Sequence, residues 1–244
     1  MSLVLATDDN GGPEIFASVQ GEGPSVGRPV AFMRLSRCNL ACLWCDTAYT
    51  WHFEGDDRPH RDGATFDRKA NQVTLSEEEV AAQITQLGQD RLVITGGEPL
   101  LQAPALAKLL DLLPDISVEI ETNGTTKAPP PLDIRVDQFN VSPKLAHSGN
   151  AADLALLPER LDAYATDPRA YFKFVIAEPS DVEEVLALRD RYKFKPGHVF
   201  LMPEGTDSET LRSREKWLAE LCLKHGFRMS DRLHIHLFGD TRGT

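Results

Sequence analysis

Short runs rich in β-branched and aromatic residues alternate with segments of helical periodicity, and this alternation constrains the fold more than any other feature. A strand, a crossover helix and a second parallel strand connect with a right-handed turn in nearly all proteins. The pattern therefore predicts an α/β fold, an open, partial TIM-like barrel of about six parallel strands with outer helices. The predicted strands are 30–36, 91–96, 117–123, 138–143, 171–176, 198–203 and 232–238.

Helix signals lie between these strands. Ser76 and Glu79 have the spacing of a capping box, and Ser180 and Glu183 repeat it. A last helix is predicted over 208–225. The chain has 244 residues without a fixed repeat or a Gly/Ser linker, so we expect one domain over 1–244. A further helix is indicated by leucines at helical spacing, which are Leu106, Leu109, Leu110 and Leu113.

Two segments fall outside this rhythm. Residues 49–74 are polar, carry many charges and include glycine and proline, so we expect an irregular insertion that is either a lid or a solvated loop. Residues 125–133, TTKAPPPLD, are expected to form a rigid surface connection rather than a ligand for a proline-binding partner.

Composition argues against several classes of partner. The chain has 26 Lys and Arg against 37 Asp and Glu, a net charge of -11, which disfavours binding to nucleic acid or anionic lipid. No apolar run approaches the roughly 20 residues that span a bilayer, and the first residues lack the pattern of a secretory signal. We therefore expect a cytoplasmic protein that binds neither membrane nor nucleic acid.

Three of the four cysteines, Cys38, Cys42 and Cys45, lie close together. Four cysteines are too few for a disulfide scaffold, so the cluster favours metal or redox chemistry. A structural zinc site needs four ligands, and a CxxC redox pair leaves Cys38 unexplained. A [4Fe-4S] cluster on three thiolates would keep one iron with an open coordination site. Cys222 lies apart on a predicted helix and is expected to pack as a small apolar residue.

Polar and glycine-rich motifs follow four of the predicted strands, at the edge where parallel α/β sheets bind ligands. The first is ITGGEP, residues 94–99, whose glycines allow the backbone to approach a ligand closely. The others are ETNGT at 121–125, NVSPK at 140–144 and LMPEG at 201–205. Each alone is compatible with a turn, but together they predict one binding mouth.

The CxxxCxxC spacing, with Trp44 before the last cysteine, resembles the cluster motif of the radical S-adenosylmethionine (SAM) superfamily. The resemblance implies that Cys38, Cys42 and Cys45 bind a [4Fe-4S] cluster whose open iron chelates SAM. It also implies that an electron from the cluster releases a 5′-deoxyadenosyl radical. The residues implied to surround SAM are Trp44, Cys45, Asp46, Gly96, Gly97, Glu98, Ser142, Pro143, Lys144, Met202, Pro203, Glu204 and Gly205.

A longer stretch narrows the family. Residues 14–47, beginning EIFASVQGEGP and ending CLWCDT, are similar to the start of the 7-carboxy-7-deazaguanine synthases. The motifs TGGEP, ETNG, VSPK and the terminal LHIHLFGDTRGT extend this similarity over most of the chain, with the insertion matched least. The resemblance implies a lyase that converts 6-carboxy-5,6,7,8-tetrahydropterin to 7-carboxy-7-deazaguanine with loss of ammonia, in queuosine and related deazapurine synthesis.

This resemblance also implies roles for individual residues. Thr47 would bind Mg²⁺, for which a hydroxyl oxygen is a suitable hard ligand. Arg34 can bind a substrate carboxylate in a bidentate manner, although by itself it would be read as a strand residue that is exposed or paired with an acid. The implied substrate-binding residues, among which 20–22 offer groups complementary to a pterin edge, are Val19, Gln20, Gly21, Glu22, Arg34, Thr95 and Asn123.

The family further implies a homodimer and a low-potential flavodoxin or ferredoxin as electron donor. Two other interpretations stay open, which are a different radical SAM enzyme such as a glycyl-radical activase and a non-enzymatic metal-binding module. His234 and His236 alternate in the last predicted strand and so are expected to share one face. No carboxylate partner is evident for them, and we assign them no metal.

Overall fold

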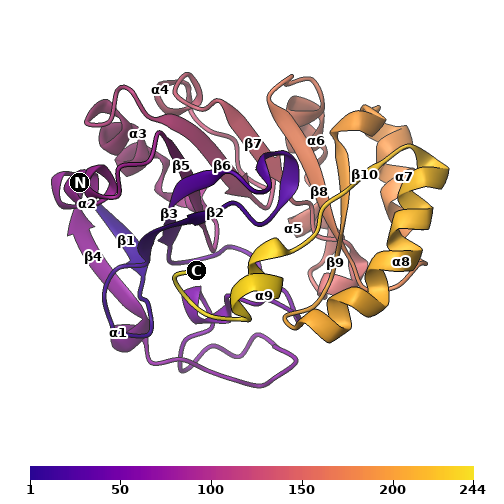
Figure 1. The fold of residues 1–244 in the computed structure, drawn as a ribbon, viewed down its shortest axis with the longest axis horizontal. Coiled ribbons are helices and arrows are strands. Elements are labelled where there is room, and N and C mark those ends of the chain that lie inside the picture. The colour runs from indigo at the N-terminus through magenta and orange to yellow at the C-terminus, as the bar shows by residue number, and fades with distance from the viewer.

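The computed structural model describes residues 1–244, whose ten strands form one curved sheet (Figure 1). The strands are β1 (Ser2–Ala6), β2 (Ile15–Val19), β3 (Pro29–Leu35), β4 (Gln72–Ser76), β5 (Arg91–Gly96), β6 (Ser117–Thr122), β7 (Gln138–Val141), β8 (Ala170–Ile176), β9 (Val199–Pro203) and β10 (Arg228–Met229). The α-helices are α1 (Arg68–Asn71), α2 (Glu77–Gln86), α3 (Ala103–Asp111), α4 (Pro130–Asp133), α5 (Ala152–Ala155), α6 (Pro158–Ala165), α7 (Asp181–Tyr192), α8 (Ser208–His225) and α9 (Leu233–Phe238). The 3₁₀ segments are η1 (Gly23–Ser25), η2 (Ala48–Thr50), η3 (Pro99–Gln102), η4 (Ala146–Ser148) and η5 (Pro196–His198).

The parallel part of the sheet has the order β3-β5-β6-β7-β8-β9, and the short β10 continues it beside β9. β1 and β2 pair antiparallel with β3, and β4 pairs antiparallel with β1. β4 and β10 end the sheet without pairing to each other, so the barrel is open. This confirms the predicted partial barrel, whereas the alternation does not predict β1, β2, β4 or β10.

Successive residues of each strand face opposite sides of the sheet. In β6, Val118 and Ile120 belong to a core of 41 buried hydrophobic residues beneath the helices. Glu119 and Glu121 alternate with them and reach partners on the concave side. Burial of apolar area therefore holds the helices outside, as Figure 1 shows, and leaves polar side chains inside the barrel.

The predicted helices form, with one difference in capping. Ser76 and Glu79 make the predicted capping box of α2, and α8 has the predicted bounds. Ser180 does not cap α7, because its own backbone is already helical. Asp181 instead accepts hydrogen bonds from the backbone N–H groups of Ala177 and Glu178, at 2.8 and 2.9 Å. None of the helices has the length and apolar character needed to cross a bilayer.

The prediction of a strand over 232–238 is wrong, because these residues form helix α9. The sheet ends at β10, and Arg232 then turns inward and binds Glu22 and Asp46. In α9 only Ile235 is buried, whereas Leu237 and Phe238 are exposed. Residues 232–238 thus have the apolar alternation of a strand, although the chain has already left the sheet after β10.

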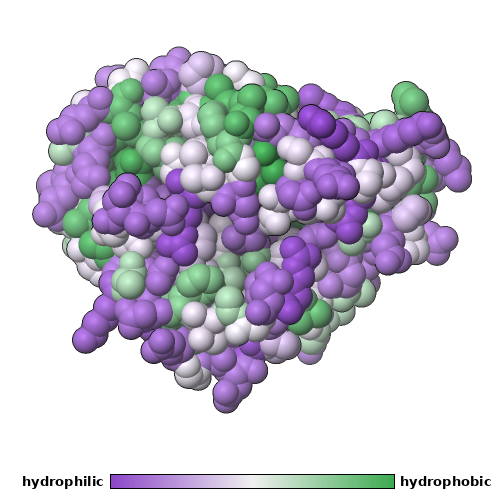
Figure 2. Space-filling view, turned by 60° about the horizontal axis from the view of Figure 1, so that its bottom comes forward, coloured by the Kyte–Doolittle hydropathy of each residue, from purple (hydrophilic) through white to green (hydrophobic).

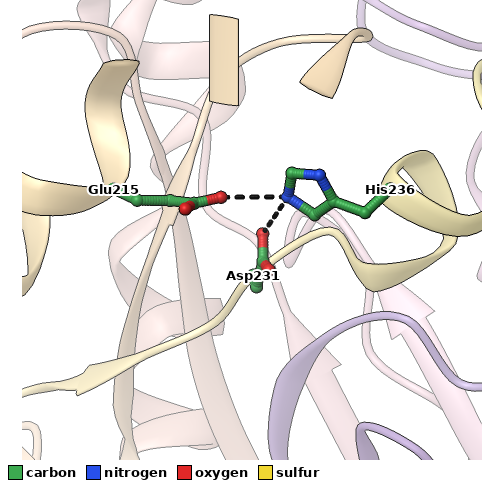
Figure 3. Close-up of side chains that lie close together, drawn as sticks. All are labelled: Glu215, Asp231 and His236. Atoms are coloured by element: carbon green, nitrogen blue, oxygen red, sulfur yellow. Dashed lines mark hydrogen bonds and ion pairs between the residues drawn. The ribbon is translucent and has the colours of Figure 1, made fainter. Parts of the chain in front are cut away.

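His236 fastens α9 to α8 (Figure 3). Its Nε2 lies 2.9 Å from Oε1 of Glu215 and 3.3 Å from Oδ1 of Asp231, and its Nδ1 lies 2.9 Å from Oγ of Ser208. His234 lines the interior instead. The expected shared face is wrong, since residues two apart on a helix point about 200° apart. His236 also has the carboxylate partners that the sequence does not reveal.

Both segments predicted as irregular contain regular structure. Residues 49–74 include α1 and the start of β4, and Trp51 and Phe53 are buried. The insertion runs along the lower edge of Figure 1, and Figure 2, which brings that side forward, shows hydrophilic residues there mixed with hydrophobic ones. In the segment 125–133, α4 forms and Leu132 is fully buried in the core, so this segment is more than a surface connection.

A buried polar network closes one end of the barrel interior. The Glu119 carboxylate accepts hydrogen bonds from Arg91 at 3.0 Å, Gln20 at 2.8 Å, Ser25 at 2.8 Å and Asn140 at 2.6 Å. These partners come from different strands and from the loop after β2. A buried charge pair is tolerated only when its remaining donors and acceptors are satisfied, and here they are.

Replacing Glu119 with alanine should therefore lower the free energy of unfolding by about 3–5 kcal/mol, because Arg91 would stay buried without its partner. Urea denaturation followed by circular dichroism would measure the change. Asp190→Ala is the control, since Asp190 pairs with Arg189 on the surface, and should cost less than about 1 kcal/mol. Equal losses in the two variants would contradict the structural importance of this network.

Candidate functional site

A cavity of about 220 Å³ occupies the concave side of the sheet. Its wall includes residues at successive strand ends, which are Thr95, Glu121, Ser142, Val175 and Met202. The structure brings most predicted binding residues together in this wall. Those that line the cavity are Val19, Gln20, Gly21, Glu22, Arg34, Cys38, Cys42, Trp44, Cys45, Asp46, Thr47, Thr95, Gly96, Gly97, Asn123, Ser142, Lys144 and Met202.

Other predicted residues lie outside the cavity wall, namely Glu98, Pro143, Pro203, Glu204 and Gly205. The Glu98 carboxylate is fully buried and accepts hydrogen bonds from Thr122 Oγ1 at 2.9 Å and Asn123 N at 2.7 Å. Burial raises the pKa of Glu98 to about 7, and these hydrogen bonds oppose the shift. Glu98 thus holds the end of β6 beside the turn after β5.

Glu204 and Gly205, which follow β9, also bind other residues of the protein rather than lining the cavity. Glu204 forms ion pairs of 2.6 Å with Arg61 of the insertion and with Arg214 of α8. The carbonyl of Gly205 accepts a hydrogen bond of 2.5 Å from Arg232. These contacts fasten the turn after β9 to three other parts of the chain.

The three clustered cysteines are free thiols that face one cavity. Burial raises the pKa of Cys38 to about 12 and that of Cys45 to about 11, and it also raises the pKa of Cys42. Thiols in such surroundings stay protonated at neutral pH unless a metal displaces the proton. The pocket therefore suits metal ligation better than free thiolate chemistry.

A cluster with one open iron requires that no fourth cysteine lies near Cys38, Cys42 and Cys45. Cys222 is no fourth ligand, because it is buried in the hydrophobic core and its Sγ lies 3.6 Å from the Arg228 carbonyl. Trp44 lines the cavity, and its buried Nε1 has no hydrogen-bond partner in the protein. Lys144 lies 5.5 Å above the Trp44 ring. Three soft sulfur ligands that face one cavity, without a fourth, fit an iron–sulfur cluster that keeps one iron open.

Gly96 and Gly97 allow two chain segments to touch. Gly96 has a φ of 138°, and a Cβ there would lie 2.1 Å from the carbonyl oxygen of Leu35. A Cβ on Gly97 would lie 2.1 Å from the carbonyl oxygen of Arg37. The glycines therefore line the cavity as predicted, but they are required because the end of β5 packs against the backbone that leads into Cys38.

A buried ion network flanks the cavity at Glu22. Lys173 and Arg232 both bind the Glu22 carboxylate, and another guanidinium nitrogen of Arg232, Nη2, binds Asp46. Burial raises the pKa of Glu22, but the two positive charges outweigh this effect and hold it well below its usual range. The sequence analysis does not identify Lys173 or Arg232. Lys173 could have been found in the sequence, since it is the one charged residue inside the apolar run YFKFVI.

Arg34 lines the cavity and is also paired with an acid. Its Nε donates to Glu14 at 2.8 Å, and the Tyr49 hydroxyl donates to the other oxygen of Glu14 at 2.9 Å. Only Nε is used in this pair, so the terminal nitrogens of Arg34 keep their donors for a ligand. Glu14 and Tyr49 are further cavity residues to which the sequence assigns no role, although Glu14 begins the segment 14–47 that resembles the family.

The C-terminal segment completes the wall. The residues from 239 onward that line the cavity are Gly239, Asp240, Thr241, Arg242 and Thr244. The Arg242 guanidinium lies 3.6 Å above the ring of Tyr49 and donates to Asn71 at 2.9 Å. His234 also lines the cavity, 3.9 Å from Glu22, and burial lowers its pKa. These contacts bring the two ends of the sheet to one site.

Known proteins are similar to this chain in sequence. The sequence model of the Radical SAM superfamily matches residues 34–144, which contain the cysteine loop and the Gly-Gly turn. The 7-carboxy-7-deazaguanine synthase of Pyrobaculum aerophilum is 38% identical over 233 residues, 94% of this chain and 95% of the relative. That of Halobacterium salinarum is 34% identical over 260 residues, 95% of this chain and 91% of the relative.

Solved structures agree with the sequence relatives. The crystal structure of QueE from Escherichia coli matches with a TM-score of 0.68 and 26% identity, over 96% of this chain and 95% of that one. Streptococcus suis SuiB shares the fold at a TM-score of 0.53 and 12% identity, over 83% of this chain and 47% of that one. With curated relatives matched over nearly their whole length, the chain belongs to the 7-carboxy-7-deazaguanine synthase family of the radical SAM superfamily.

Proposed function

We propose that this chain converts 6-carboxy-5,6,7,8-tetrahydropterin to 7-carboxy-7-deazaguanine with release of ammonia, as a carbon–nitrogen lyase of deazapurine synthesis. The observation that carries the proposal is a single cavity where three free thiols, a Gly-Gly turn and buried charged groups meet. The names of the relatives support the product. The resemblance supports the pterin substrate.

Three thiolates would hold the cluster, at Cys38, Cys42 and Cys45. When bound, a [4Fe-4S] cluster and SAM together supply a carbon-centred radical that can remove a hydrogen atom from the substrate. Trp44 lines the cavity and would contact the cofactor through its ring. Lys144 donates to Ser142 Oγ at 2.8 Å, so both side chains are positioned at one strand end. The other residues proposed to surround SAM in the wall are Asp46, Gly96, Gly97 and Met202.

The substrate would occupy the end of the cavity near Gln20 and Glu22. Lys173 and Arg232 keep Glu22 ionised, so its oxygens can accept hydrogen bonds from pterin N–H groups. Thr95 donates to Glu121 at 2.8 Å and is thereby oriented beside this end. Arg34 would bind the substrate carboxylate through its terminal nitrogens. The remaining proposed substrate contacts are Val19, Gly21 and Asn123.

Two further parts of the proposal come from the resemblance. Thr47 would bind Mg²⁺ that orients the substrate carboxylate, and its hydroxyl lies in the cavity wall 3.6 Å from Cys45 Sγ. The electron donor would be a flavodoxin or ferredoxin, and the active form a homodimer.

The direct test incubates anaerobically reconstituted, reduced protein with SAM, Mg²⁺ and 6-carboxy-5,6,7,8-tetrahydropterin. Mass spectrometry should detect 7-carboxy-7-deazaguanine, and omission of the reductant should abolish it. SAM cleavage without this product would assign the chain a different substrate. Iron content close to four per chain, with little zinc, would separate the enzyme from a metal-binding module.

Cys42→Ala should lose both the cluster and product formation, because two thiolates cannot replace the ligand set of three. Cys222→Ala is the matched control, since Cys222 lies in the core away from the cavity, and should retain both. Iron analysis and product yield measure the two effects. Retention of a full cluster by Cys42→Ala would contradict the ligand assignment.

Thr47→Ala should weaken the stimulation by Mg²⁺ and raise the KM for the pterin roughly tenfold, because one hard oxygen ligand is lost. Its cluster content should stay at the wild-type level. The exposed Thr74 of β4 provides the control variant Thr74→Ala, which should keep the wild-type response. An unchanged Mg²⁺ dependence in Thr47→Ala would remove Thr47 from the metal site.

A further inference from the structure

We propose that Trp51 and Asn150 raise the reduction potential of the iron–sulfur cluster by donating hydrogen bonds to two of its three cysteine ligands. The inference rests on the proposed function, since it takes Cys42 and Cys45 as cluster ligands. It assigns tuning residues outside the CxxxCxxC motif, and one of them lies in the insertion that the sequence leaves without a role.

The donors lie close to the sulfur atoms. Trp51 Nε1 is 3.3 Å from Cys45 Sγ, and Asn150 Nδ2 is 3.3 Å from Cys42 Sγ. The Asn123 amide makes a longer contact of 3.9 Å with Cys38 Sγ and also donates at 3.0 Å to Asn39. The sulfur atoms here stand for the thiolates of the loaded protein, and a charged acceptor strengthens such hydrogen bonds.

Trp51 is held in this orientation by the insertion. The residue is 4% exposed, and its backbone N–H donates to Ala48 O at 3.0 Å. The guanidinium of Arg58 lies 4.7 Å from the centre of the Trp51 ring, on its face. A buried indole with a fixed ring face has little freedom to move its N–H away from the sulfur.

The insertion also forms hydrogen bonds with the backbone on both sides of Trp44. The His60 Nε2–H donates to the carbonyl of Cys45 at 2.9 Å, and Arg61 N donates to the carbonyl of Leu43 at 2.9 Å. The insertion is therefore neither a free lid nor a solvated loop in its buried part. It is a scaffold that places an N–H donor against one cysteine and fixes the loop that carries it.

Asn150 donates to Cys42 from a segment distant in the chain from the insertion. Its side-chain oxygen accepts from Ala41 N at 2.9 Å, which leaves the amide N–H groups for Cys42 Sγ and Ser148 Oγ. The same amide therefore anchors the loop and donates to a sulfur ligand. Its position does not depend on the insertion.

The direction of the effect follows from charge. Hydrogen bonds to the sulfur ligands are among the factors that set cluster potentials. Reduction adds negative charge to the cluster and its thiolates, so an N–H donor stabilises the reduced form more than the oxidised form. Each donor should therefore make the cluster easier to reduce by a low-potential protein donor.

The test measures the midpoint potential of the reconstituted cluster by potentiometric titration with electron paramagnetic resonance, without pterin. Trp51→Phe keeps an aromatic ring but removes the N–H, and should lower the equilibrium constant for one-electron reduction roughly tenfold, which corresponds to about 59 mV. Resonance Raman of the oxidised cluster should show a higher Fe–S stretching frequency. Trp217→Phe on α8 is the matched control and should keep the wild-type potential and spectrum.

Asn150→Ala is the second variant, and its shift should add to that of Trp51→Phe because the two donors act on different sulfurs. Full iron content with unchanged potentials in both variants would overturn the proposal, as would loss of the cluster from both. If only one variant keeps its cluster, the potential of that variant decides. A wild-type protein that assembles no [4Fe-4S] cluster would instead refute the proposed function.

Discussion

The buried ion network at Glu22 is the interaction on which the site depends. It joins the loop after β2, strand β8, the turn before α9 and the cysteine loop through Glu22, Lys173, Arg232 and Asp46. Removing these charges from water is costly, and the cost is offset only when every charge finds its partners. A partly formed network would be unfavourable. The cavity wall around Glu22 therefore forms only when segments from both ends of the chain have folded together.

The parallel core of the fold is predictable because its signal is local. Each β/α repeat carries its own apolar run and helix periodicity, whereas the antiparallel strands β1, β2 and β4 are defined by partners elsewhere in the chain. The error at 232–238 has the same origin. The course of this segment is set by the ion pairs of Arg232 with Glu22 and Asp46, and no property of the segment itself reports those distant partners.

The sequence singles out residues whose spacing is fixed by chemistry, such as Cys38, Cys42 and Cys45, and the structure places these three in one cavity wall. Prediction from the sequence is less successful in separating residues that line the cavity from residues that support it. Glu98 belongs to a motif, yet its carboxylate is occupied by hydrogen bonds within the protein. Conversely, Glu14 lines the cavity and begins the segment 14–47 that resembles the family, yet the sequence assigns it no role, because a single acid before a strand has no distinguishing pattern.

The least regular segments of the chain control the environment of the cysteine loop. The insertion brings Trp51 to Cys45, and the turn before α9 brings Arg232 to the next residue, Asp46. The parallel sheet could not supply both contacts, because its side chains point along fixed directions at fixed spacing. The insertion and the turn before α9, both packed on the rigid sheet, can therefore place a neutral donor and a positive charge beside two adjacent residues, Cys45 and Asp46.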